Sequence, residues 1–510
     1  TLFPGSVNYA TADSEGLVEF YWNPALGHVL QTLDPAGNLI KAVADFADLG
    51  GGAVVFIQSG TGSVERTAQD KLRDIVSVKD FGAVGDGTTD DTAAIALATG
   101  ALVPGQSLDF GDGTYLVSSQ LVLTALAQNK LFGRATIKAS AANTATYMLD
   151  LQGTTDVIVE GLVFDANKVA RTTSTSAGLG CINASSSTRI TIRDCTFKNA
   201  VGFINGAAES KSWVALVISG AATAPTVDNV RLIDCGDSPN SKACDGLFIR
   251  ANHAAITNIY GENVTDHVVA MEGCNYSVAK GIRGNNCTSI AAMSNDTNTD
   301  CVGNIIDGVT GTSNYIGSYG GIVGAYAGLS GGAGKLLDCI IQNVSVSAAT
   351  GAGGGGSGMY LAGPLRITLR NIVMNGSAAA AVNNGIALDK TSGRVIIEDN
   401  HILIAAGQAS AIRLINGATG ALIRRNTLEG GDYGIAADGA SDYVAGGNVF
   451  VGRAVSDEFL TGGATHAHQT IDDVLGQQGA AVADATDAAT AITQLNALLA
   501  RARDLGLIAT

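Results

Sequence analysis

Proline is scarce in this sequence, at 7 of 510 residues, so its 66 glycines belong neither to a collagen-like repeat nor to proline–glycine linkers. Charged side chains are also few, at 15%, where a globular protein usually has about a quarter. Apolar runs such as Ala53–Ile57 are far too short to span a bilayer, so we expect no membrane insertion. Many short apolar strands joined by glycine- and asparagine-containing turns would give this composition.

The sequence has no excess of positive charge, because 46 acidic side chains outnumber 30 basic ones and leave a net charge of −16. A nucleic-acid or anionic-membrane partner would require a basic surface, so we expect neither. No charged start followed by an apolar stretch opens the sequence, so we also expect no secretory signal.

The 8 cysteines are scattered and form no C-x-x-C pair, which argues against zinc and thioredoxin-type sites. Buried free thiols are the favoured interpretation, and a few disulfides are the alternative. The run Gly351–Gly358 lacks the lysine and the following helix of a phosphate-binding loop, and Asp296–Asp300 lacks the glycine and glutamate of a calcium loop. We therefore expect no cofactor and no metal.

A short pattern recurs along the chain: apolar, any, apolar, two further residues, a small or amide residue, any, apolar. Clear copies are Val157–Phe164, Ile190–Phe197, Val395–Ile402, Ala421–Leu428 and Tyr443–Phe450. A strand period of two that returns every ~20 to 40 residues is typical of a β-solenoid. We therefore predict an all-β fold, a right-handed parallel β-helix of roughly a dozen coils.

The sixth position of this pattern predicts a column of stacked side chains, because successive coils lie about 4.8 Å apart. Asn400, Asn426 and Asn448 occupy this position in successive copies, where their amides can bond one another. We expect Cys195 and Cys235 at the same position of earlier coils.

The pattern divides the chain into three parts. Residues 1–75 show little repeat and predict a small N-terminal domain, whereas residues 76–455 form the β-helix. Residues 456–510 comprise a linker and a short C-terminal helix. Apolar residues from Ala485 to Ala502 follow the spacing of a coiled-coil seam, so this helix either associates with other subunits or folds back on its own coils.

The β-helix is expected to begin with a capping helix at about residues 89–99. Thr89 or Asp90 is a suitable N-cap, and acidic residues in the first turn suit the helix dipole. The apolar face with Ile95 and Ala98 would cover the open end of the solenoid, which otherwise exposes unpaired strand edges.

The stretch Gly60–Ile95 resembles the junction between the neck and the β-helix of bacteriophage tailspikes, including the run Val78-Lys-Asp-Phe-Gly82 and the acidic Gly85–Asp91. The resemblance implies a homotrimer with a virion-attaching N-terminal part that contacts other phage tail or baseplate proteins. It also implies a pectate-lyase-like β-helix that binds, and usually cuts, a bacterial surface polysaccharide. Assembly in the cytoplasm of the bacterial host and a place in the virion tail would follow.

Cleavage of a glycosidic bond requires two carboxyl groups, one as acid and one as base or nucleophile. Residues one coil apart stack on a solenoid, and Asp245 and Asp266 are separated by about one coil. If both side chains point outward, their carboxylates lie roughly 5 Å apart, and their pKa values should separate. The alternative interpretation is that Asp245-Gly246 forms an ordinary solenoid turn.

This segment is also similar to the polygalacturonase family, which has Asn-Thr-Asp-Gly followed about one coil later by Asp-Asp. Asp245 and Gly246 match the end of the first motif, and Asp266 matches the first residue of the second. His267 replaces the second aspartate, and the family's Gly-His-Gly has no counterpart near Cys287–Ile290. The resemblance implies a shared geometry and leaves the mechanism open.

Further residues are expected to contact the sugar. In the hydrolase interpretation, Arg250, Glu272 and Phe248 lie near the substrate, and the ring of Tyr315 offers a second flat face. The alternative is a lyase that cleaves a uronic-acid-containing glycan by β-elimination, with His267 as base and with Lys280 and Arg283 holding the acidic sugar. A spike that binds glycan without cutting it, or a purely structural spike, would need none of these roles.

Overall fold

The structure is a computed structural model. It describes residues 30–33, 39–43, 55–124, 126–171, 179–200, 213–236, 244–315, 321–328, 332–353, 357–376, 384–405, 410–439, 441–453, 455–461 and 463–468. The chain divides into two compact units, Thr1–Ile75 and Val76–Thr510. The β-helix continues past the predicted boundary at residue 455, because Ser456–Leu460 and Thr465–His468 are strands that pair in parallel with the preceding coil. The C-terminal helix expected within residues 456–510 lies outside the described residues, and its role and that of residues 1–75 remain predictions.

The described part of the first unit contains two short antiparallel pairs. Strand β1 (Leu30–Leu33) pairs with β2 (Leu39–Val43), and β3 (Val55–Phe56) pairs with β4 (Arg66–Thr67). Helix α1 (Ala68–Leu72) follows, and its N-cap residue Thr67 accepts a hydrogen bond from the backbone N–H of Asp70 at 2.9 Å.

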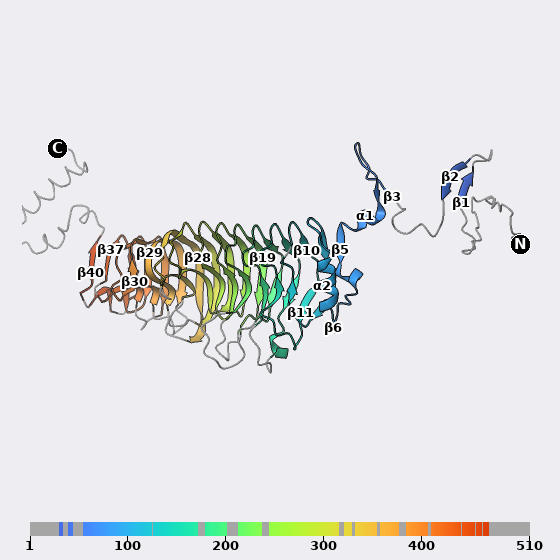
Figure 1. The fold of residues 1–510 in the computed structure, drawn as a ribbon. Coiled ribbons are helices and arrows are strands. Elements are labelled where there is room, and N and C mark those ends of the chain that lie inside the picture. Colours follow the sequence, from blue (N-terminus) through green and yellow to red (C-terminus); the bar gives the residue numbers. More distant parts are fainter. Residues whose placement is uncertain are drawn as a thin grey trace, which may run out of the picture. The chain divides into compact units, whose positions relative to one another are not determined.

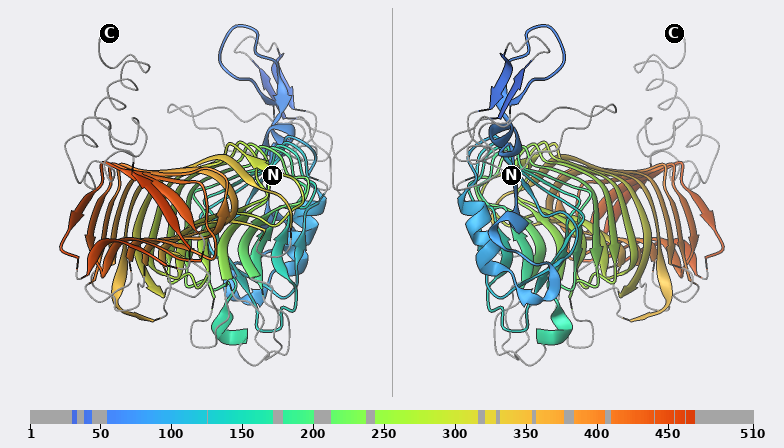
Figure 2. Two further views of the ribbon diagram at one scale, coloured as in Figure 1. Left: turned by 90° about the vertical axis from the view of Figure 1, so that its left-hand side faces the viewer. Right: turned by 90° about the vertical axis from the view of Figure 1, so that its right-hand side faces the viewer.

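The second unit is a right-handed parallel β-helix, as the sequence predicts (Figure 1). Each coil contributes three strand segments that pair in parallel with those of the next coil, and two further views show the coils stacked along the unit (Figure 2). The third strand segment of each coil belongs to one parallel sheet, which we call sheet 1. The first and second segments together form the other sheet, which we call sheet 2.

The strands of sheet 1 are β9 (Leu121–Val122), β12 (Tyr147–Asp150), β15 (Gly180–Asn183), β18 (Trp213–Ile218), β20 (Cys244–Ile249), β22 (His267–Glu272), β24 (Ser289–Asn295), β27 (Val323–Ala327), the first part of β29 (Ser357–Gly376), β30 (Asn384–Ser392), β33 (Ser410–Ile415), β36 (Tyr433–Ala437) and β39 (Ser456–Leu460).

The strands of sheet 2 are β5 (Ile75–Ser77), β6 (Asp86–Asp90), β7 (Ser107–Asp109), β8 (Thr114–Val117), β10 (Lys130–Phe132), β11 (Thr136–Ala139), β13 (Ile158–Glu160), β14 (Val163–Asp165), β16 (Thr191–Arg193), β17 (Thr196–Lys198), β19 (Thr226–Ile233), β21 (Ala255–Glu262), β23 (Val278–Cys287), β25 (Cys301–Val302), β26 (Ile305–Tyr315), β28 (Leu336–Gly353), the rest of β29, β31 (Val395–Glu398), β32 (His401–Ile404), β34 (Ala421–Arg424), β35 (Thr427–Gly430), β37 (Asp442–Gly446), β38 (Val449–Val451) and β40 (Thr465–His468). Two 3-10 turns, at Val78–Phe81 and Lys168–Arg171, flank the first coils.

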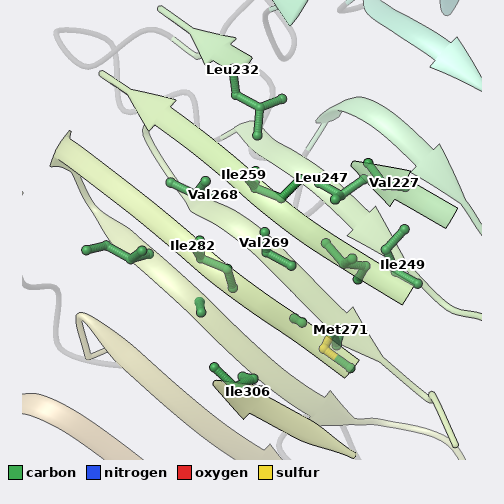
Figure 3. Close-up of a cluster of buried hydrophobic side chains, with 14 of the residues drawn as sticks. Val227, Leu232, Leu247, Ile249, Ile259, Val268, Val269, Met271, Ile282 and Ile306 are labelled. Atoms are coloured by element: carbon green, nitrogen blue, oxygen red, sulfur yellow. The ribbon is translucent and has the colours of Figure 1, made fainter. Parts of the chain in front are cut away.

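Alternate residues of these strands fill one continuous core. Leu247 and Ile249 of β20 face Val269 and Met271 of β22, and Ile259 of sheet 2 packs in the same layer (Figure 3). Each such side chain is fully buried, which stabilises the fold by about 1.5–3 kcal/mol relative to an exposed one.

The bend between the two segments of sheet 2 is made by a single residue in the left-handed conformation. In the coils from β19 to β29, the residues at this corner have φ between 49° and 72° and form one column, Asn229, Asn258, Gly281, Gly308, Asn343 and Asn371. Asparagine and glycine tolerate this conformation best, which explains why the sequence is rich in both.

The connection from sheet 2 to sheet 1 differs in length from coil to coil, unlike this corner. It comprises residues 199–212 between β17 and β18, residues 234–243 between β19 and β20, and residues 263–266 between β21 and β22.

The predicted asparagine column is confirmed. The Nδ2 of Asn400 donates to Oδ1 of Asn426 at 2.9 Å, and the Nδ2 of Asn426 donates to Oδ1 of Asn448 at 3.0 Å. The placement of Cys235 in the same column is wrong, because Thr196 pairs with Arg231 and thereby sets Val230 opposite Cys195. Cys235 lies at the next corner of that coil.

The predicted capping helix is α2 (Thr92–Gly100), at the N-terminal end of the coils (Figure 1). Its Ile95 and Ala98 are fully buried, as expected. The N-cap residue is Asp91 rather than Thr89 or Asp90, and its carboxylate accepts the backbone N–H groups of Val84 at 2.6 Å and Gly85 at 3.2 Å. It therefore fixes the preceding turn instead of the helix end.

All eight cysteines are buried and unpaired, which confirms the free-thiol interpretation over disulfides. Burial raises the pKa of Cys235 to about 12, so this thiol stays protonated and unreactive at neutral pH. Among the described residues, no helix is long and apolar enough to cross a membrane.

Candidate active site

The candidate catalytic residues lie where two neighbouring strands of sheet 1 begin. Leu247 of β20 faces Val269 of β22 in the parallel register. Asp245 and His267 each lie two residues before these partners, and Asp266 directly precedes β22. The residue stacked on Asp245 is therefore His267, whereas Asp266 approaches from the turn.

Both carboxylates contact the same nitrogen of His267. The Nδ1 atom lies 3.0 Å from Oδ1 of Asp245 and 2.9 Å from Oδ1 of Asp266. The backbone N–H of His267 also donates to Oδ1 of Asp245, at 3.2 Å. The Asp245 side chain is 7% exposed, against 22% for Asp266 and 21% for His267, so Asp245 orients the ring while the other two reach the surface.

Charge at this cluster follows from burial and from the short contacts. Burial raises the pKa of Asp245, and the neighbouring Asp266 adds to this effect, while the hydrogen bond from His267 opposes it. Burial alone would lower the pKa of His267, but Asp266 and Asp245 outweigh it and hold that pKa well above 6.5. The two carboxylates therefore favour the protonated form of His267, in which the Nδ1–H group faces both of them.

The same three groups are a possible donor set for a divalent cation. One oxygen of each aspartate and one ring nitrogen lie within 4.8 Å of one another. The sequence predicts no metal, and the contacts to a protonated ring are those of a hydrogen-bonded triad. A metal would have to displace that proton from His267.

Three of the expected sugar-contacting residues form a cluster farther along the same strands. Arg250, at the end of β20, pairs with Glu272 of β22, and its guanidinium lies 5.7 Å from the ring centre of Phe248. Arg250 stays 43% exposed in this pair. The outer face of sheet 1 thus presents the ring of Phe248 and the guanidinium of Arg250 on the strands that carry the triad.

Two tyrosines lie farther along the outer face of sheet 1, on β27 and β29. The Tyr326 and Tyr360 rings lie 5.9 Å apart and are 7% exposed each, so they are largely buried. The charges of His267 and Asp266 both act on the Tyr326 hydroxyl, whose pKa burial raises. The sequence leaves two interpretations open for Tyr326 and Tyr360, an aromatic platform for sugar rings or partial burial against a neighbouring subunit, and both side chains are largely buried. The side chain of Tyr315, which the sequence predicts to contact the sugar, lies outside the described residues.

Lys280 and Arg283 lie on β23 in sheet 2, and the structure does not bring them to the triad in sheet 1. The Nζ of Lys280 is 3.9 Å from Oδ2 of Asp307, one coil on. Arg283 faces Tyr260 of β21 in the parallel register. These two cations therefore belong to a different face of the β-helix from His267.

Comparison with known proteins first defines a class. The sequence model of the family described as "Rhamnogalacturonase A/epimerase, pectate lyase-like" matches residues 75–314, which include the triad and the capping helix. The match covers slightly less than half of the chain and agrees with the parallel β-helix that the structure shows.

Particular relatives are phage proteins. The chain is 42% identical over 71 residues to the tail spike protein of an Escherichia phage, a match that covers 14% of this chain and only 8% of that protein. A mutant tailspike of Escherichia coli bacteriophage HK620 has a TM-score of 0.58 at 12% identity, covering 82% of this chain and 84% of its own. A second HK620 tailspike structure, in complex with a pentasaccharide, has a TM-score of 0.56 at 13% identity, covering 81% and 83%. The predicted resemblance to phage tailspikes with a pectate-lyase-like β-helix is confirmed.

Proposed function

We propose that this chain is a tailspike that binds a bacterial surface polysaccharide, an O-antigen or a capsule, and cleaves it by glycoside hydrolysis. The observation that carries the proposal is the contact of Asp245, Asp266 and His267 at one edge of a pectate-lyase-like β-helix. Similarity to tailspikes, one of them solved with a pentasaccharide, supports the class of substrate.

We propose a separate role for each member of the triad. The Nδ1–H of His267 faces the two carboxylates, which leaves its Nε2–H to protonate the departing glycosidic oxygen. Asp266, the more exposed carboxylate, acts at the anomeric carbon as base toward water or as nucleophile. Asp245 is a positioning residue that holds the ring and stabilises its charge.

The elimination mechanism is less well supported. A lyase base must be neutral before it takes a proton, and the pKa of His267 lies well above its ordinary value. The cations Lys280 and Arg283, which would neutralise a uronate, lie in sheet 2 rather than beside His267. Both observations favour hydrolysis.

The proposal extends to assembly. A homotrimer would present three equivalent sites, and simultaneous binding to a repeating glycan would raise the overall affinity. The N-terminal unit, residues 1–75, is proposed to attach to other tail or baseplate proteins. The protein would assemble in the host cytoplasm and act from the virion tail.

The test is incubation of the purified protein with a panel of purified O-antigens and capsules. New reducing ends and the ultraviolet absorbance of an unsaturated uronate are followed together. We expect reducing ends without absorbance, and a loss of at least about 100-fold in rate for Asp266→Asn and His267→Gln. The matched control is Asp150→Asn, a carboxylate of sheet 1 several coils away.

Other outcomes would replace this proposal. A joint rise of both signals would establish a lyase. Binding without any cleavage would establish a receptor protein that does not cut its glycan. Full activity in both triad variants, with unchanged melting temperatures, would move the chemistry away from His267.

A further inference from the structure

A second group of chemically distinctive side chains lies on sheet 2. Tyr260 of β21 faces Arg231 of β19 on one side and Arg283 of β23 on the other, in the parallel register. The three side chains therefore form one outward row across three successive coils. Both arginines are exposed and Tyr260 is half-buried.

This row borders a hollow with a volume of about 480 Å³. The lining residues are Asn229, Arg231, Asn258, Ile259, Tyr260, Gly281 and Arg283. The Arg231 guanidinium lies 5.5 Å from the ring centre of Tyr260, within the range of a cation–π contact. The left-handed corner residues Asn229, Asn258 and Gly281 also line the hollow.

The two arginines differ from most others on this surface. Elsewhere an arginine typically pairs with a carboxylate on a neighbouring coil, as Arg189 does with Asp156 and Arg366 with Asp338. Within the described part of the chain, neither Arg231 nor Arg283 makes an ion pair. On a chain of net charge −16, two guanidinium groups without a carboxylate partner thus lie around one hollow.

Nearby carboxylates are already engaged. Glu262 accepts the hydroxyl of Tyr260 at 3.1 Å. Asp228 accepts Oγ1 of Thr257 at 2.5 Å and Nδ2 of Asn258 at 2.9 Å. These bonds hold both acids in place, so the guanidinium groups keep their donors for a ligand.

We propose that this hollow binds an acidic sugar residue of an oligosaccharide, separately from the triad. The strand spacing of about 4.8 Å sets Arg231 and Arg283 about 10 Å apart at their backbones, with the ring of Tyr260 between them. One sugar ring lies on Tyr260, and its carboxylate accepts paired N–H donors from a guanidinium fork. A neutral sugar would gain only the ring contact.

This inference rests on the proposed function only for the glycan nature of the ligand. The hollow is formed by β19, β21 and β23 of sheet 2, whereas the triad belongs to the starts of β20 and β22 in sheet 1. Binding at the hollow therefore does not require cleavage, and the two claims can fail independently.

The experiment measures binding of tetragalacturonate and of neutral maltotetraose by calorimetry to the full chain. We expect the acidic tetrasaccharide to bind more tightly at low salt, and the double variant Arg231→Gln/Arg283→Gln to weaken it at least about tenfold. The control Arg366→Gln, an exposed arginine of sheet 2 with its own carboxylate partner, should bind as the wild type does. Asp266→Asn should also retain binding.

Three results would overturn the inference. The first is equal affinity for the neutral and acidic tetrasaccharides. The second is binding that Asp266→Asn abolishes and the double arginine variant leaves intact, which would assign the acidic sugar to the triad. The third is no detectable binding of tetragalacturonate at low salt by the correctly folded wild type.

Discussion

His267 is held by two carboxylates through one ring nitrogen, and this arrangement fixes its charge. Each carboxylate favours the imidazolium, and together they overcome the cost of burying it. The raised pKa favours a protonated His267 at pH values where a free histidine is mostly neutral.

The first prediction concerns the alkaline limb of activity. Replacing Asp245 by Asn removes one negative neighbour, so the pKa of His267 should fall by about one unit or more. The alkaline limb of kcat/KM should move to lower pH by the same amount, and NMR titration of the His267 ring should report the shift independently. An unmoved ring titration would show that Asp245 does not stabilise the charge.

The second prediction concerns stability. The folded-state pKa of His267 lies above its unfolded value of 6.5, so its contribution is fully present below about pH 6.5. That contribution is lost as the pH rises through the raised pKa. The melting temperature of the wild type should therefore decline on the alkaline side more steeply than that of His267→Gln. Parallel curves would contradict the ion pairing.

At the scale of elements, the asparagine column replaces apolar packing by hydrogen bonding within the core. Asn426 is buried, donates to Asn448 at 3.0 Å and to the carbonyl of Ile397 at 2.9 Å, and accepts from Asn400. Both neighbouring asparagines of the column, Asn400 and Asn448, therefore share a hydrogen bond with the side-chain amide of Asn426.

The third prediction follows from this column. Asn426→Ala leaves buried donors and acceptors without partners, and should lower the free energy of unfolding by about 2 kcal/mol. Chemical denaturation measures the loss, with Gln152→Ala, an exposed amide, as the control. A change equal to that of the control would indicate that water replaces the missing amide.

The sequence predicts the β-helix well where a coil is short and its corners interrupt the pattern. The copies at residues 395–402, 421–428 and 443–450 match β31 to β38 for this reason. Where one strand runs through the corner, as β19 does, the start of the copy is ambiguous. The sequence prediction placed Cys235 opposite Cys195, whereas the residue at that position is Val230, five residues earlier. The error arises because apolar residues alternate on both sides of Asn229 within β19, so the pattern can be started at either side.

At the scale of the whole molecule, the proposed homotrimer can be tested by measuring the mass of the assembled protein. The fourth prediction is that light scattering of the full chain gives three times the monomer mass, and that truncation after Gly479 gives the monomer with an unchanged melting transition of the β-helix. A monomeric full chain, or a truncated trimer, would remove the role proposed for the C-terminal helix.

The site was only partly predictable from the sequence, because the lengths of the connections between coils decide which side chains become neighbours. Asp245, Asp266 and His267 lie on adjacent coils with a short connection, so motif spacing suffices to bring them together. Tyr326 lies two strands farther along sheet 1, and its approach depends on the length of each connection between. The row with Arg231 and Tyr260 likewise becomes visible only when the register is known.

The two kinds of connection in each coil have unequal freedom to change. The corner of sheet 2 is one left-handed residue whose neighbours on both sides are fixed by the strand register, so an insertion there would displace every following side chain. The connection into sheet 1 already differs in length between coils without disturbing the pairing of β18, β20 and β22. A lineage of such proteins can therefore exchange the surface beside the triad by inserting or deleting residues at this edge, while inheriting the same scaffold.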